Sequence, residues 1–159
     1  MGIINTFVFI AQPNAAKWTN YSNEKYQISY PENWERSERS GDLLLTNYPY
    51  VIKIINSSAS GPGMCYYSEN EKTEVNYPGW VYIDYKEFKL GIHTVRRSKI
   101  PQEIKKGVDS YNICEKDKTS ERYGSITGFG YIFYNIPIGV SNETLEIMDS
   151  IVKTLKKNN

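Results

Sequence analysis

The C-terminal segment limits the possible folds most, because its apolar residues recur with the spacing of one helix face. Leu145, Met148, Ile151, Val152 and Leu155 are related by three- and four-residue steps, which is typical of an amphipathic helix. A stripe of this kind is stable only against another element, so we predict a C-terminal helix that covers one face of a sheet. Burial of these side chains would contribute on the order of 10 kcal/mol before the loss of conformational entropy.

Several upstream segments alternate between apolar and polar residues, which predicts β-strands. In residues 26–30, Tyr and Ile alternate with Gln and Ser. Two pairs of segments, 43–45 with 51–55 and 80–85 with 88–95, are separated by short turns and predict hairpins. Because the strands come in hairpins without strand–helix–strand alternation, the predicted class is α+β. We expect an antiparallel, hairpin-built β-sheet covered by the amphipathic C-terminal helix.

The rest of the chain gives weaker patterns. Residues 109–114 and 124–134 are rich in apolar and aromatic side chains and predict two more strands. The mixed charges of residues 115–122 between them indicate a solvated hairpin loop. Residues 101–107 begin with Pro and end with Gly, which suits one or two helical turns.

The N-terminal residues indicate export. Residues 3–11 form a short apolar run, and residues 12–16 end in two alanines, which resembles the apolar region and cleavage segment of a signal peptide. An ordinary first strand or short helix is the alternative, and the run is too short to span a bilayer. We therefore divide the chain into a truncated signal peptide (1–16), a polar linker (17–25) and a single domain (26–157). The expected location is extracytoplasmic: periplasmic, secreted or at the cell surface.

Length and charge limit the class of partner. A chain of 159 residues fits one domain. The formal net charge is only +1, so no overall field favours nucleic acid or an anionic membrane. A protein partner is compatible with this balance, and no oligomeric state follows from it. The 14 tyrosines suit either the filling of a sheet or an exposed aromatic binding face.

The two cysteines, Cys65 and Cys114, have neither the spacing nor the histidine partners of a zinc site. In an exported protein they would form a disulfide that stabilises the fold by roughly 4 kcal/mol in the chain-entropy model. In a reducing compartment they would be buried free thiols. The choice between the two therefore depends on the compartment.

No set of residues indicates catalysis. His93 is the only histidine, and it lies in an alternating segment, whereas catalytic groups favour loops. Asp84 and Glu87 would act as a glycosidase-like pair only if the fold placed two acids across a cleft. We expect Trp34 to anchor the core, with a ligand platform as the alternative. We expect the basic residues 96–99 to be solvated surface, with a contact to an anionic partner as the alternative. We predict no catalytic residue, no metal site and no cofactor.

Residues 23–35 read Asn-Glu-Lys-Tyr-Gln-Ile-Ser-Tyr-Pro-Glu-Asn-Trp-Glu. This Tyr-rich strand with its Tyr-Pro-x-x-Trp turn resembles the opening of PsbP-like domains. The end of the chain is similar in kind, because the aromatic strand 131–134 precedes a helix that contains residues 148–155. The resemblance implies a Mog1/PsbP-like fold, whose members are mostly adaptors or assembly factors, not enzymes. No residue of this sequence matches a binding residue of that family, so the resemblance implies no binding site.

These observations favour an exported, non-enzymatic binding or adaptor domain with a protein partner. The first alternative is a hydrolase that acts with carboxylates or with His93 on the sheet face. The second is an aromatic platform for carbohydrate or single-stranded nucleic acid, which would need several exposed tyrosines beside Arg or Lys.

Overall fold

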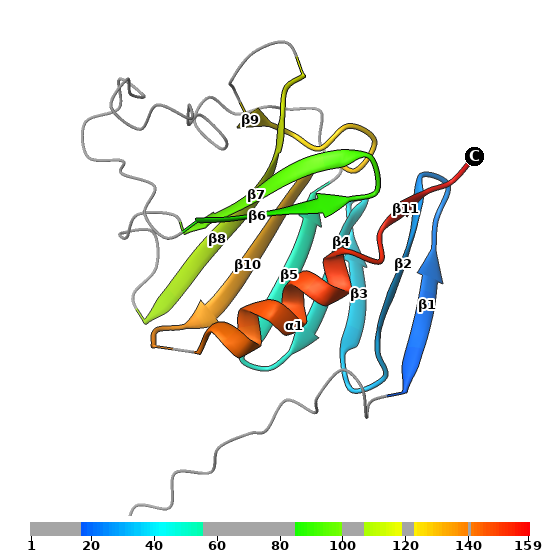
Figure 1. Cartoon of the computed structure of the whole chain (residues 1–159). Coiled ribbons are helices and arrows are strands. Elements are labelled where there is room, and N and C mark those ends of the chain that lie inside the picture. Colours follow the sequence, from blue (N-terminus) through cyan, green and yellow to red (C-terminus); the bar gives the residue numbers. More distant parts are fainter. Residues whose placement is uncertain (1–16, 56–84, 100–106, 119–122, 140) are drawn as a thin grey trace, which may run out of the picture.

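The computed structural model describes residues 17–55, 85–99, 107–118, 123–139 and 141–159. These residues form eleven strands and one helix (Figure 1). Their bounds are β1 Trp18–Ser22, β2 Tyr26–Pro31, β3 Glu35–Arg39, β4 Asp42–Asn47, β5 Tyr50–Ile55, β6 Tyr85–Leu90, β7 His93–Lys99, β8 Val108–Lys116, β9 Tyr123–Gly124, β10 Tyr131–Pro137, α1 Asn142–Val152 and β11 Lys156–Lys157.

The strands form two antiparallel sheets. The larger has the order β3-β4-β5-β10-β8-β7-β6, and the short β9 also pairs with β8. The smaller has the order β1-β2-β11, so the end of the chain adds a short strand beside β2. Residues 26–30 lie in β2, where Tyr26, Ile28 and Tyr30 are buried, because alternate side chains of a strand point to the same face.

The main hydrophobic cluster joins both sheets and the helix. β2 contributes its alternate aromatic and aliphatic side chains, and β4 and β5 contribute aliphatic ones. β8 and β10 contribute aliphatic side chains together with Tyr111 and Tyr134. The five apolar residues of the C-terminal stripe are all buried in it, although Leu155 lies just beyond α1. A smaller cluster consists of Cys114, Tyr123 and Tyr131 with Ile55 and Phe133. Because Tyr131 and Ile132 are neighbours on β10, the two clusters lie on opposite faces of the larger sheet.

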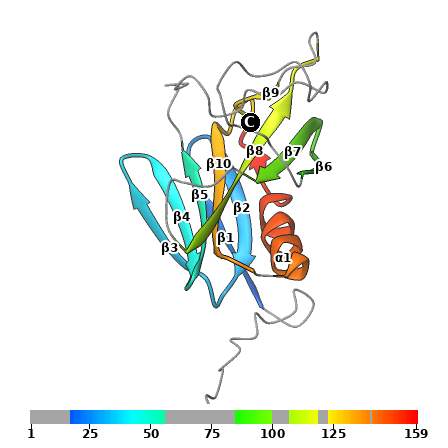
Figure 2. The same cartoon turned by 90° about the vertical axis from the view of Figure 1, so that its left-hand side faces the viewer.

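The predicted class, an α+β fold whose sheet is covered by the C-terminal helix, is wrong. The protein is a mostly antiparallel β structure with one helix of 11 residues in its described part. Such a helix is about 16 Å long, whereas the seven strands in line span about 29 Å. Figure 2 shows α1 beside one part of the strand layer. The apolar stripe identified a buried face but not the extent of that face. Most of the remaining core comes from the larger sheet, and β2 adds Tyr26, Ile28 and Tyr30.

Two further predictions differ from the structure. Within the segment 17–25, residues Trp18–Ser22 are not a linker but strand β1, paired with β2 over its full length. The hairpin expected at 80–85 and 88–95 is shifted: β6 pairs with β7, and the turn lies at Gly91, whose φ is +58°. Glycine adopts this left-handed conformation readily, which explains the position of the turn. Residues 1–16, 80–84 and 101–106 lie outside the described residues.

Candidate binding site

His93 and Glu115 form a constrained polar contact at one end of the sheets. His93 begins β7 and Glu115 lies near the end of β8, with Nδ1 of His93 2.5 Å from Oε1 of Glu115. The other oxygen, Oε2, accepts a hydrogen bond of 2.7 Å from the backbone N–H of Thr127. Both side chains are largely buried, with 16% and 12% exposed. The contact therefore ties two strands to the segment after β9.

The Glu115 carboxylate is stabilised in its charged form. Its burial acts to raise the pKa, but hydrogen bonds from the Thr127 backbone N–H and from His93 act in the opposite direction and hold the pKa of Glu115 below its ordinary value. Since ionised Glu115 accepts both bonds, the contact is strongest above the pH at which this group takes up a proton.

The segment of residues 125–130, called here the 125–130 loop, is fixed by its own backbone. Ile126 and Gly130 exchange two backbone hydrogen bonds of 2.8 and 2.9 Å, and Ile126 and Phe129 are buried in the main cluster. Gly128 and Gly130 have φ values of +88° and +86°, which other residues adopt only with strain. The loop therefore has one well-defined shape.

Two surface depressions meet at the 125–130 loop and share Ser125 and Thr127 as lining residues. The smaller, of about 380 Å³, is also lined by His93, Glu115 and the charged residues 116–118. The larger, of about 630 Å³, is also lined by Glu24, Lys25, Gly128, Lys157 and Asn158. In Figure 1 the loop lies near the β6–β7 turn and the C-terminus. Volumes of this size are within the range of ligand-binding sites.

The C-terminal residues of the larger depression are held in place by several bonds. Lys156–Lys157 pair with β2, and the backbone N–H of Asn158 donates to the carbonyl oxygen of Lys25 at 3.0 Å. The Asn158 amide nitrogen also donates to Oγ of Ser22 at 3.2 Å and to the carbonyl oxygen of Asn23. The Lys157 side chain lies over Gly128, where Cδ is 3.5 Å from the position of an added Cβ.

An exposed apolar residue stands beside this polar surface. Ile92, in the β6–β7 turn, is 78% exposed and lines the smaller depression. We call this region the loop end, defined as residues 91–93, 115–118 and 125–130 with Lys25, Lys157 and Asn158. An exposed isoleucine next to fixed polar groups is typical of a contact surface, in which an apolar anchor is surrounded by a polar rim.

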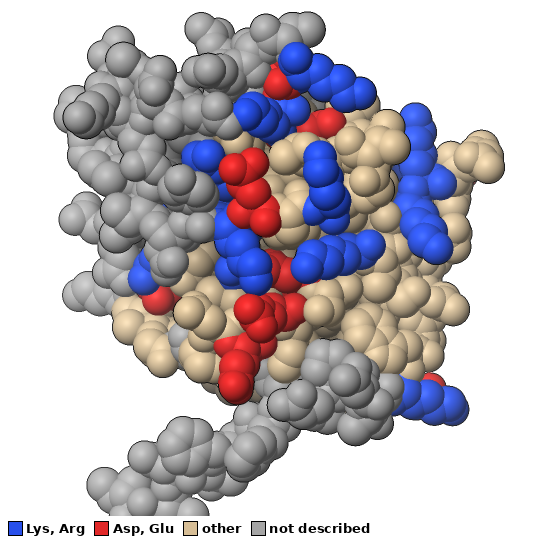
Figure 3. All heavy atoms as spheres, viewed as in Figure 1, with Lys and Arg blue, Asp and Glu red and all other residues tan. Residues whose placement is uncertain are grey.

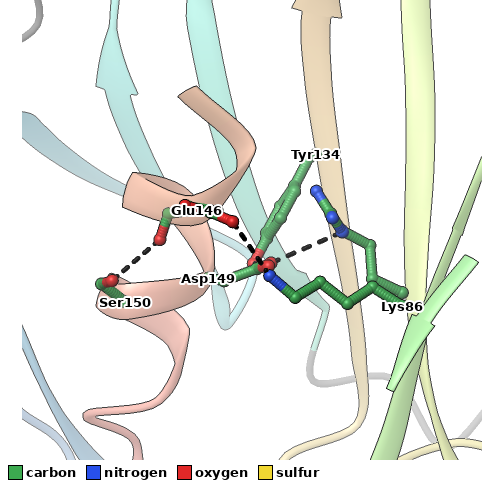
Figure 4. Close-up of polar contacts among 6 residues, drawn as sticks. Lys86, Tyr134, Glu146, Asp149 and Ser150 are labelled. Atoms are coloured by element: carbon green, nitrogen blue, oxygen red, sulfur yellow. Dashed lines mark hydrogen bonds and ion pairs between the residues drawn. The ribbon is translucent and has the colours of Figure 1, made fainter. Parts of the chain in front are cut away.

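A second polar group lies under α1 (Figure 4). The Asp149 carboxylate is 3.6 Å from Nε of Arg97, and the Tyr134 hydroxyl donates to Asp149 Oδ1 at 3.1 Å. Burial raises the pKa of Asp149, while the positive charge of Arg97 acts against this shift. Beside them, Lys86 Nζ and Glu146 Oε1 form an exposed ion pair of 3.2 Å. The group connects the helix to β7 and β10, which suits a structural role.

The basic residues of β7 are not the solvated surface that the sequence suggested. Arg96, Arg97 and Ser98 are 4%, 7% and 0% exposed. Because successive side chains alternate, Arg97 points to the helix face and Arg96 to the other face, where its guanidinium lies 4.6 Å from the centre of the Tyr123 ring. Both faces of β7 are covered by other residues, and the basic sequence of residues 96–99 does not reveal this.

The structure separates most of the predicted candidates. Trp34 is buried in the main cluster, and the Glu87 carboxylate is 3.8 Å from the Arg96 guanidinium, while Asp84 lies outside the described residues. Cys114 is fully buried. Cys65 lies outside the described residues, so the disulfide stays a prediction. Of the predicted candidates, His93 alone lies in the loop end.

Sequence reasoning missed the partners of His93. It assigned Glu115 to a solvated hairpin loop and residues 124–134 to one strand. The available signals were Gly128 and Gly130, which interrupt that expected strand and in fact form the loop between β9 and β10.

Within the described residues, no group of three or more His, Cys, Asp or Glu side chains could hold a metal ion. No helix in the same part of the chain is both long and apolar enough to cross a membrane. Comparison with family models, curated proteins and solved structures finds no significant match. The PsbP-like resemblance therefore depends on the quoted sequence motifs alone and stays a prediction.

Proposed function

We propose that this chain is an exported binding or adaptor domain without a catalytic step of its own, and that a protein partner docks at the loop end. The observation that carries the proposal is the pair of adjoining depressions at the 125–130 loop, with exposed Ile92 beside them. A fixed concave surface binds with a smaller loss of conformational entropy than a mobile one, and an exposed aliphatic side chain gains free energy when a partner covers it.

The two alternatives have less support. His93 contacts a carboxylate, and among the described residues no serine or cysteine hydrogen-bonds to it, so a nucleophile activated by this histidine is missing there. An aromatic platform needs exposed rings. Six of the described tyrosines are instead buried: Tyr26, Tyr30, Tyr111, Tyr123, Tyr131 and Tyr134.

Export is the part of the proposal that depends on the N-terminal residues 3–16. The PsbP-like motifs support an adaptor role, because that resemblance implies adaptors and assembly factors. Fold resemblance alone does not determine function, so the docking surface has to be tested directly.

Site-specific photo-crosslinking tests the docking surface. A photoreactive amino acid at exposed Ser125, in the 125–130 loop, is expected to give one discrete covalent adduct in cells that produce the full chain. The same amino acid at Ser37 is the matched control, because Ser37 is an exposed serine on the edge strand β3. Equal adducts from the two positions, or none from Ser125, would contradict docking at the loop end.

A pair of isoleucine variants distinguishes a specific contact from non-specific hydrophobic association. Ile92→Asp is expected to reduce the Ser125 adduct about tenfold, because a buried aliphatic contact contributes 1–2 kcal/mol. Ile138→Asp is the control, since Ile138 is also exposed, at 54%, but lies in the turn after β10. If both variants reduce the adduct equally, Ile92 is not an anchor and the proposed surface is wrong.

A further inference from the structure

We propose that two copies of this chain associate through strand β3, which forms one edge of the larger sheet. Within the described residues, β3 has β4 as its one hydrogen-bonded neighbour. Figure 2 shows the β3–β4 hairpin at the margin of the molecule, away from α1. All five residues of β3 are exposed, which leaves its outer edge accessible to another strand. This surface is separate from the loop end, so the proposal does not depend on the proposed function.

The charges of β3 are complementary to those of a second, reversed copy of the same strand. β3 consists of Glu35, Arg36, Ser37, Glu38 and Arg39. When two copies pair in antiparallel orientation about Ser37, Glu35 lies opposite Arg39 of the second copy. Arg36 likewise lies opposite Glu38 of the second copy. Two-fold symmetry repeats both pairings, so every charge of the strand faces an opposite charge, which stabilises an antiparallel ladder.

The backbone of β3 is compatible with this pairing. The β3–β4 hairpin turns over residues 40–41, which both have positive φ values, and Arg39 pairs with Asp42 beside the turn. The pair that flanks a two-residue turn exchanges backbone hydrogen bonds, and hydrogen-bonded pairs then alternate along the ladder. Arg36 and Glu38 therefore direct their backbone N–H and C=O groups away from β4, toward the free edge.

Only one symmetric register satisfies both the backbone and the charges. A residue that directs its backbone groups to the free edge must meet another of the same kind. Arg36 can therefore pair with Glu38, or each can pair with its own copy. The two self-pairings place like charges directly opposite each other, which is unfavourable. The register about Ser37 is thus favoured, whereas charges that only protect an edge from association need no such match.

The contacts that these side chains make within one chain do not prevent the pairing. Arg36 and Glu38 form an ion pair in which 40% and 46% of the two side chains stay exposed. The Arg36 guanidinium also lies 4.6 Å from the centre of the Tyr21 ring. These contacts restrict the two side chains in advance, so that less conformational entropy is lost when a second copy adds an opposite charge to each.

The local pattern of β3, and not a general attraction between molecules, carries the recognition. Figure 3 shows Lys and Arg interspersed with Asp and Glu over the face that carries α1, so this face has no large field of one sign. Two strands of five residues form a junction below the usual size of stable interfaces, about 1,200–2,000 Å². We therefore expect a weak dimer that dissociates on dilution and on addition of salt.

Analytical ultracentrifugation of the purified full chain at increasing concentration tests the association. Glu35→Arg places like charges opposite each other at two positions of the junction and is expected to raise the dimer dissociation constant about tenfold. Combining Glu35→Arg with Arg39→Glu restores opposite charges and is expected to restore the dimer. These two positions are about 13 Å apart along one strand, so a contact within one chain does not explain such a rescue.

Glu143→Arg is the matched control, because it changes the net charge equally at an exposed position on α1. A wild-type chain that stays monomeric at every concentration would overturn the proposal. An equal loss of dimer in Glu143→Arg and Glu35→Arg would show that only net charge matters, and would overturn it as well. Failure of the double variant to restore the dimer would refute the register about Ser37.

Disulfide trapping tests the register by geometry. In the proposed junction Ser37 faces its own copy in a non-hydrogen-bonded pair, with Cα atoms about 4.5 Å apart, which a disulfide can span. Under mild oxidation, Ser37→Cys is expected to form a covalent dimer. Glu35→Cys is expected to form none, because its two copies would lie about 14 Å apart. The wild type controls for the native cysteines, and equal dimers from both variants would contradict the register.

The two proposals of this work fail in distinguishable ways. A photo-adduct between two copies at Ser37 has the mass of two chains, which separates it from an adduct with a different protein at Ser125. A chain that stays monomeric but still gives the Ser125 adduct would refute the β3 dimer and leave the binding function intact. Loss of the Ser125 adduct with an unchanged dimer concerns the binding function alone.

Discussion

Replacement of Asp149 by alanine is expected to destabilise the fold strongly, although the residue lies on a helix face that carries charged neighbours. Asp149 is 1% exposed. Its carboxylate is the partner of the Tyr134 hydroxyl and the nearest acid to the guanidinium of Arg97. Alanine would leave a buried hydroxyl without its acceptor and a buried cation without its counter-charge.

The expected magnitude follows from those two losses. Leaving one member of a buried ion pair alone destabilises proteins by about 3–5 kcal/mol, and the hydroxyl that loses its acceptor adds about 1 kcal/mol. The separation of 3.6 Å between Arg97 Nε and Asp149 Oδ1 exceeds an ideal hydrogen bond. Because the buried carboxylate is itself unfavourable, as the raised pKa indicates, we expect the total near the lower end of this sum, about 4 kcal/mol.

Urea denaturation followed by circular dichroism measures this change in the free energy of unfolding. The control is the double variant Arg97→Met with Asp149→Leu, in which both charges are removed and the volume is kept. We expect the double variant to lie within about 1 kcal/mol of the wild type. A single Asp149→Ala variant with wild-type stability, or a double variant less stable than the single one, would refute this reasoning.

Two other predictions concern the loop end. Glu115→Gln is expected to lower the free energy of unfolding by about 1–2 kcal/mol at neutral pH. The folded-state pKa of Glu115 is lowered, so the carboxylate stabilises the fold fully above the unfolded-state pKa. This contribution disappears as the pH falls through the folded-state pKa. Urea titrations of wild type and variant from pH 7 down to pH 3 measure it, and a difference that does not change with pH would contradict the role of the carboxylate. Gly128→Ala is expected to lower stability by about 1–2 kcal/mol through its φ of +88°, while Gly124→Ala, where an added Cβ meets nothing within 4 Å, should change little. Thermal unfolding of the two variants compares them, and equal midpoints would exclude backbone strain at residue 128.

The parts of the fold that could be predicted from the sequence are those governed by a local period. Residues 26–30 alternate and form β2, and the residues around the turn at 47–49 form the β4–β5 hairpin. The C-terminal stripe indicated which side chains are buried. It did not reveal that the helix ends at Val152 or that the chain then returns to pair with β2.

The remainder depends on contacts that no local pattern records. All five residues of β3 are exposed, so that this strand lacks an apolar alternation and exists through its pairing with β4. The loop end depends on pairs far apart in sequence: His93 with Glu115, Glu115 with Thr127, and Lys157 with Gly128. Each residue alone resembles ordinary surface, and only the register of the strands brings them together.

The most direct test is to label lysine side chains chemically and to measure their reactivity by mass spectrometry. The purified chain is compared with the chain in a freshly prepared extract of its cells. If a partner docks at the loop end, Lys25 and Lys157 should react more slowly in the extract. Exposed Lys17 and half-buried Lys53, which lie outside that surface, should react equally in both samples. Unchanged reactivity at Lys25 and Lys157, together with slower labelling of Lys17 or Lys53, would place the binding surface elsewhere on the molecule.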